Sequence, residues 1–105
     1  VLMPKVILFF FFYKRAARLY SEIARELGFT PKSDQEGAEF LARAIEMRNS
    51  KMKIPGKLRD MGIDEDEYMG QIESMIVQIE NDICTEYSPR RFSRFEIEKF
   101  LRELY

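Results

Sequence analysis

The most regular hydrophobic pattern in the chain occupies residues 72–104 and predicts one helix, a short corner and a second helix. In the first helix, isoleucines recur at intervals of four, three and four residues, which places them on one stripe of an α-helix. These residues are Ile72, Ile76, Ile79 and Ile83. The corner spans residues 84–93, where Ser88 precedes Pro89 and the helical period is interrupted.

The second helix is predicted to begin at Ser93, because Glu96 follows three residues later. This Ser-x-x-Glu spacing is typical of a capping box, in which the two side chains bond to backbone amides in the first turn of a helix. The apolar residues that follow fall on one stripe. They are Ile97, Phe100, Leu101 and Leu104.

The N-terminal part of the chain contains an unbroken apolar run from Val6 to Tyr13. The run is too short to span a bilayer, which takes about 20 apolar residues in a helix. We therefore interpret it as a buried helix start, or as the seam with a larger protein, and Pro4 suits the first turn of a helix. A β-strand is the alternative, because the four phenylalanines of the run favour β-structure.

Residues 14–27 predict a helix with Leu19, Ile23 and Leu27 as its apolar stripe, and Gly28 is the expected stop. Ser33 with Glu36 predicts the start of a third helix, which continues to about Met52 and ends in residues 53–56.

One side of this third helix is predicted to carry Leu41, Ala44, Ile45 and Arg48. Gly37 lies in its first turn, where glycine weakens a helix by roughly 1 kcal/mol relative to alanine.

Residues 57–61 predict a short helical turn closed by Gly62, and Asp64 is expected to cap the long helix that contains Ile72. The whole pattern predicts an all-α fold of four or five helices. At 105 residues the chain is at most one domain, so we expect residues 1–105 to form a single helical unit. Because the chain begins with Val, we also expect it to be a fragment of a larger protein.

The composition, 46% hydrophobic and 33% charged, is typical of a globular helical protein. The net charge of −1 argues against nucleic acid as a partner, since nucleic-acid binders usually carry a clear basic excess. The single cysteine fits a reducing compartment, so we expect a cytoplasmic protein with no membrane partner. The absence of histidine excludes Ser-His-Asp and Cys-His catalytic arrangements and histidine zinc motifs within the chain.

Four groups of residues have both a chemical and a packing interpretation, and we favour packing or capping for each. The acidic residues 64–67 could bind a hard cation, but they also suit a capped helix start. Arg90, Arg91 and Arg94 could bind phosphate, but they form one short basic turn in a neutral chain. Cys84 could be a nucleophile, yet it has no histidine to activate it and is expected in the core. The last group consists of five methionines, which could line a binding groove, but gap-filling packing is the simpler interpretation. These are Met47, Met52, Met61, Met69 and Met75.

The C-terminal residues resemble the closing signature of the iron-dependent alcohol dehydrogenase family. The matching positions are Asp82, Cys84, Thr85, Pro89, Arg90, Glu96, Ile97 and Tyr105. Ser88 stands where the family usually has Asn, and Phe92 stands where a second Pro is common. Two earlier segments are also similar to the family and occur in the same order, namely residues 2–28 and the linker of residues 54–63.

The resemblance implies a particular place within a larger enzyme. In that family an N-terminal α/β domain binds NAD(P), and a helical domain holds iron, or sometimes zinc, through one Asp and three His. The metal polarises the oxygen of an alcohol or aldehyde while hydride passes to or from the nicotinamide. The similarity begins just after the last of those histidines, so it implies no catalytic, cofactor-binding or metal-ligating residue in this chain.

Two interpretations of the chain's role remain open. In the first, the chain is the C-terminal helical portion of a metal-dependent dehydrogenase, where it backs the metal site and is inactive alone. In the second, it is a stand-alone helical interaction module without catalysis. The expected partners are the rest of the parent dehydrogenase or other copies of the chain in a homo-oligomer. Exchange of the N-terminal helix between copies would cover the apolar run of residues 6–13.

Replacing Ser93 by Ala tests the predicted capping box. The substitution removes the side-chain acceptor for the first amides of the last helix and should lower the free energy of unfolding by about 1 kcal/mol. A urea titration of both proteins measures this difference. An unchanged midpoint would mean that no helix is capped at Ser93.

Overall fold

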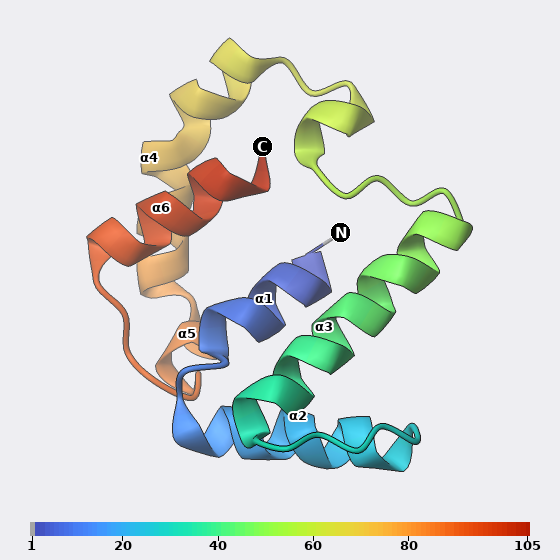
Figure 1. Ribbon diagram of the computed structural model, residues 1–105. Helices are drawn as coiled ribbons and strands as arrows, with labels where there is room; N and C mark the ends of the chain where they lie inside the picture. The colour runs from blue at the N-terminus through green and yellow to red at the C-terminus, as the bar shows by residue number, and fades with distance from the viewer. Residues whose placement is uncertain (1) are drawn as a thin grey trace. The chain divides into compact units, whose positions relative to one another are not determined.

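The computed structural model describes residues 2–105, apart from the side chain of Cys84. Every regular element in this part of the chain is helical, which confirms the predicted all-α fold (Figure 1). The α-helices are α1 (Leu2–Phe10), α2 (Lys14–Glu26), α3 (Asp34–Lys51), α4 (Glu65–Asn81), α5 (Ile83–Glu86) and α6 (Arg94–Leu104), and η1 (Leu58–Met61) is a 3₁₀ turn. None of these helices is both long enough and apolar enough to cross a membrane.

The chain divides into two compact units, Val1–Gly56 and Lys57–Tyr105, and each is described by itself. Unit 1 contains α1, α2 and α3, and unit 2 contains η1, α4, α5 and α6. That residues 1–105 form one helical unit stays a prediction.

The apolar N-terminal run is helical, as expected, and not a strand. It lies mainly in α1, where Pro4 in the first turn is buried and Ile7 is 1% exposed. Helix α1 ends at Phe10, within the run, and Phe12 beyond its end is 80% exposed. Within the run Ile7 is buried, Phe12 is exposed, and the other residues are partly buried.

The apolar stripe predicted for α2 is not the buried face of that helix. Leu19, Ile23 and Leu27 are 46%, 48% and 62% exposed. The buried residues of α2 are small instead, namely Ala16, Ala17, Ser21 and Ala24, and Tyr20 packs partly buried beside them. The difference has a steric cause, because α3 comes close to α2 at Gly37 and small side chains fill the space between the two helices at that point.

The matching surface of α3 contains Gly37, Ala38 and Ala42, together with the larger Leu41. Ala38, Leu41 and Ala42 join Ile7 of α1 and Ala24 of α2 in one buried cluster. The predicted core side of α3 is therefore right at Leu41. Further along that side, Ala44 and Ile45 are half-buried and Arg48 is exposed.

The two helices approach each other closely at Ser21 and Gly37. A Cβ atom added to Gly37 would lie 2.3 Å from the Ser21 hydroxyl oxygen and 2.8 Å from its Cα. Ser21 is fully buried, and its hydroxyl has no hydrogen-bond partner within the described part of the chain. Glycine is needed at position 37 for space, and this outweighs its unfavourable helix propensity.

The predicted helix ends are confirmed by hydrogen bonds. The Ser33 side chain accepts from the Glu36 amide at 3.1 Å, and the Asp64 carboxylate accepts from the Glu67 amide at 3.0 Å. After α2 the chain turns through Gly28 at φ 96°, where two backbone hydrogen bonds form a Schellman motif.

Unit 2 is organised around the predicted stripes of α4 and α6. Ile72 and Ile76 of α4 pack in one buried cluster with the apolar side of α6. The α6 members are Ile97, Leu101 and Leu104, with Phe100 partly buried against them. Ile79 is also partly buried, but the extension of the stripe to Ile83 is wrong. Helix α4 ends at Asn81, the backbone of Asp82 is extended, and Ile83 is 67% exposed in a separate short helix.

Tyr105 fastens the end of α6 to the rest of unit 2. Its ring stacks on Tyr68 with centroids 5.4 Å apart, and its hydroxyl donates to the main-chain oxygen of Ile63 at 2.7 Å. Arg59 lies over the same ring and donates through Nε to the main-chain oxygen of Tyr105 at 2.9 Å. The Tyr68 hydroxyl in turn donates to the main-chain oxygen of Leu101. Burial raises the pKa of both phenols, which favours the protonated form that donates these hydrogen bonds.

Three of the five methionines expected to fill gaps in the core are too exposed for that role. Met69 and Met75 pack against the core of unit 2, as expected. The interpretation is wrong for Met47, Met52 and Met61, which are each more than half exposed.

Replacing Gly37 by Ala should destabilise the chain by about 1–3 kcal/mol, because the new methyl group would overlap Ser21. The matched control is Gly70→Ala, at a helical glycine where an added Cβ meets nothing within 4 Å. This control should raise stability by about 0.5–1 kcal/mol through helix propensity alone. Denaturant titration of the two variants measures both effects. Equal changes in the free energy of unfolding for the two variants would contradict the close approach of α2 and α3.

Candidate functional site

The residues that suggested a function gather at the corner between α4 and α6. The backbone leaves α4 at Asp82 in an extended conformation and forms the single turn of α5, and a loop then leads to Ser93 at the start of α6. The Thr85 amide donates to the Asp82 carbonyl at 3.0 Å, so α5 is joined directly to the end of α4.

Ser88 holds the turn after α5. Its hydroxyl donates to the Thr85 carbonyl at 2.6 Å, and its amide donates to the same carbonyl at 3.2 Å. A serine side chain that bonds back to a carbonyl three residues earlier stabilises a turn. Ser88 therefore gives the corner a local hydrogen bond at the position where the similar family usually has Asn.

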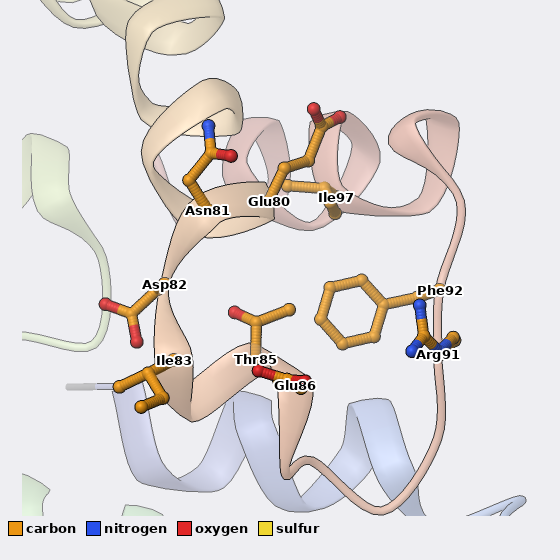
Figure 2. Close-up of a pocket in the computed structure, with 9 residues that line it drawn as sticks. All are labelled: Glu80, Asn81, Asp82, Ile83, Thr85, Glu86, Arg91, Phe92 and Ile97. Atoms are coloured by element: carbon orange, nitrogen blue, oxygen red, sulfur yellow. The ribbon is translucent and has the colours of Figure 1, made fainter.

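A pocket of about 640 Å³ opens at this corner (Figure 2). It is lined by Glu80, Asn81, Asp82, Ile83, Thr85, Glu86, Arg91, Phe92 and Ile97. Figure 2 shows the Phe92 ring directed toward Thr85, with Ile97 of α6 on one side of the space. The lining combines acidic side chains, one arginine and apolar side chains, so the pocket presents polar and apolar surface in about equal measure.

The structure brings only some of the signature residues together around this pocket. Asp82, Thr85 and Ile97 line it, whereas Arg90 and Glu96 form an ion pair beside it. Arg91 and Phe92 also line the pocket, although Arg91 was expected only as part of a basic turn. The residue spacing does not distinguish Arg91 from Arg90 and Arg94, so the sequence contains no local signal for its place in the pocket lining.

The Arg90–Glu96 ion pair fastens the corner loop to the first turn of α6. Glu96 also accepts from the Ser93 amide at 3.3 Å, and the Ser93 hydroxyl accepts from the Glu96 amide at 3.2 Å, which completes the predicted capping box. The hydrogen bond from Arg90, followed by the one from the Ser93 amide, lowers the pKa of Glu96 below its usual value of 4.5.

Arg94 makes a second connection, between α6 and α4. It forms ion pairs with Glu73 and, at 3.6 Å, with Glu80. Two of the three corner arginines thus contact acidic groups of the same unit. This arrangement supports a packing role for Arg90 and Arg94 and leaves Arg91 as the arginine that faces the pocket.

Two other candidate groups are placed as follows. Cys84 lies in α5, but its side chain is outside the described residues, so its expected place in the core stays a prediction. The acidic residues 64–67 begin α4, where Asp64 is the cap. Across residues 2–105, without the Cys84 side chain, the structure contains no group of three or more potential metal ligands.

The residues present therefore do not fit the metal that the resemblance implies. The sequence has no histidine, and the carboxylates near the pocket do not form a ligand cluster. We derive no chemical step through a metal or a nicotinamide at this corner.

Comparison with known proteins identifies relatives along the whole chain. A family model described as Fe-containing alcohol dehydrogenase family, C-terminal, matches residues 1–105. The NADPH-dependent butanol dehydrogenase of Clostridium saccharobutylicum is 27% identical over 92 residues, which is 88% of this chain and 24% of that protein. The aldehyde-alcohol dehydrogenase of Streptococcus pneumoniae is 33% identical over 78 residues, which is 74% of this chain and 9% of that protein.

The bifunctional aldehyde-alcohol dehydrogenase of Escherichia coli is also similar, at 28% identity over 93 residues. That match covers 87% of this chain and 10% of the relative. The chain thus spans about a quarter or less of the length of these curated relatives. No solved structure matches the chain with comparable significance.

Replacing Glu96 by Gln should remove part of the acid sensitivity of the fold. A lowered pKa means that the carboxylate favours the folded state above its ordinary pKa, and this contribution is lost as pH falls through the lowered value. Wild type should therefore be more stable than the variant at neutral pH, and the difference should shrink as pH falls through the lowered pKa of Glu96.

Urea midpoints between pH 7 and pH 3 measure this difference. The control is Glu103→Gln on the same helix, where the described residues provide no ion-pair partner. If the difference in urea midpoint between wild type and Glu96→Gln stays constant with pH, the role given to the Arg90 contact is contradicted.

Proposed function

Because the chain belongs to the Fe-containing alcohol dehydrogenase family, we propose that it forms the C-terminal helical portion of an NAD(P)-linked, metal-dependent alcohol or aldehyde oxidoreductase in the cytoplasm. The observation that carries the proposal is the family match over all 105 residues. The names of the relatives, butanol dehydrogenase and aldehyde-alcohol dehydrogenase, support alcohols and aldehydes as the substrate class.

In this proposal the chain has a structural role. It backs the metal site and completes the core of the helical domain, while the metal ligands and the cofactor-binding segment lie in other parts of the enzyme. The absence of histidine from the sequence supports this division of labour, because the family's metal needs three histidines. The corner pocket, with Arg91 and Phe92 in its lining, is the surface best suited to meet those other parts.

A stand-alone interaction module is the second candidate function. The observation that favours it is the set of large apolar side chains that α2 leaves exposed, since such side chains often mark a contact with another protein. This module would share ancestry with the dehydrogenases but would lack their chemistry.

The reading frame upstream of Val1 separates the two candidates. A frame that continues into a glycine-rich cofactor-binding segment and a paired-histidine motif supports the dehydrogenase. A stop codon directly before Val1 supports the stand-alone module and would overturn the first proposal. Sequencing the genomic DNA around the gene provides this observation without any assay.

The purified 105-residue chain should show no NAD(P)-linked oxidation of butanol and no tight iron or zinc site. The physical reason is the absence of histidine and of a phosphate-binding glycine-rich loop from its sequence. Absorbance at 340 nm and metal analysis measure both properties, with the intact butanol dehydrogenase of Clostridium saccharobutylicum as positive control. Turnover above background, or one bound metal ion at submicromolar affinity, would refute the structural role.

A further inference from the structure

The outer face of α2 is an apolar stripe that unit 1 does not cover. Leu19, Ile23 and Leu27 are spaced at i, i+4 and i+8, so they lie on one side of the helix. Each is roughly half exposed, although residues of this size and spacing normally form the buried face of a helix. The small-residue face of α2 already packs on α3, so the helix has two faces suited to packing and uses one of them.

A charged residue stands at each end of the same stripe. Arg15 precedes Leu19 by four residues, and Glu26 follows Ile23 by three, so both belong to this face. Within residues 2–105, neither side chain has an ion-pair partner. By contrast, Arg18 and Glu22 lie 4.0 Å apart and form their own pair along the helix.

We propose that this face of α2 binds the same face of a second copy of the chain, with the two helices antiparallel about a two-fold axis. In such a pairing Leu19 lies opposite Ile23 of the second copy. The basic N-terminal end of each stripe then lies beside the acidic C-terminal end of the other, and Arg15 comes within reach of Glu26 of the second copy. A two-fold contact repeats each interaction twice, so the charge pattern of the stripe is complementary to itself.

The expected strength of this contact follows from its size. One pair of helix faces, with three partly exposed apolar residues on each, buries less than the roughly 1,200–2,000 Å² typical of stable complexes. The dimer should therefore be weak, with a dissociation constant on the order of 100 μM. This pairing requires no dehydrogenase chemistry, so it holds or fails independently of the proposed function.

Sedimentation equilibrium of the full 105-residue chain, from about 5 μM to about 1 mM, tests the proposal. The average mass should rise from 12.5 kDa toward twice that value as the concentration increases. Ile23→Glu should weaken association at least about tenfold, because it places a charge at the centre of the apolar contact. The matched control is Val77→Glu, at an α4 residue that is 44% exposed, and this variant should associate like wild type.

Charge reversal tests the antiparallel geometry. Arg15→Glu alone and Glu26→Arg alone should each weaken the dimer, because each places like charges opposite one another across the two-fold axis. The double variant, with both substitutions, should recover the association of wild type. This recovery would separate a true contact from damage to the fold, and circular dichroism of each variant checks that the helices are retained.

Three results would overturn the proposal. The first is a monomer at every concentration up to about 1 mM. The second is association that Ile23→Glu leaves unchanged, which would place the contact elsewhere, for example at the exposed end of the N-terminal run. The third is a double charge variant that associates no better than either single variant, which would exclude the antiparallel pairing.

Discussion

The close approach of α2 to α3 at Ser21 and Gly37 is the constraint on which unit 1 depends. Small side chains fill the contact at this point, so the alanine face of α2 turns inward, while Leu19, Ile23 and Leu27 turn outward. The usual relation between residue size and burial is thus reversed on this helix. The exposed stripe is a direct consequence of the tight contact on the opposite side.

Unit 2 uses a different means of holding its helices together. Isoleucine and leucine stripes form its core, and directed interactions then set the ends of the helices. Tyr105 and Arg59 join the end of α6 to the η1 turn, while Arg90 and Arg94 join the beginning of α6 to its own loop and to α4. The corner pocket lies beside the second group of contacts, so its shape depends on these two arginines.

The sequence predicts the helix ends well and the packing faces less well. Caps at Ser33, Asp64 and Ser93 depend on residues three positions apart, so local spacing is enough to find them. The buried face of α2 depends instead on the side chains that α3 presents, and no periodicity within α2 reveals them. At the candidate site, the motif located the corner correctly, but the direction in which Arg91 and Phe92 point depends on the folded loop.

The position of Tyr105 in the core of unit 2 also affects the order in which the chain can fold during synthesis. Helices α1, α2 and α3 follow one another closely in sequence and pack together, so the contacts within unit 1 can form once residue 56 has left the ribosome. The apolar stripe of α4 is made early, but most of the residues that it packs against belong to α6 and Tyr105, which are made later. A nascent chain therefore carries one finished helical unit followed by a helix with an exposed apolar face, which is the stage most prone to aggregation or to binding by a chaperone.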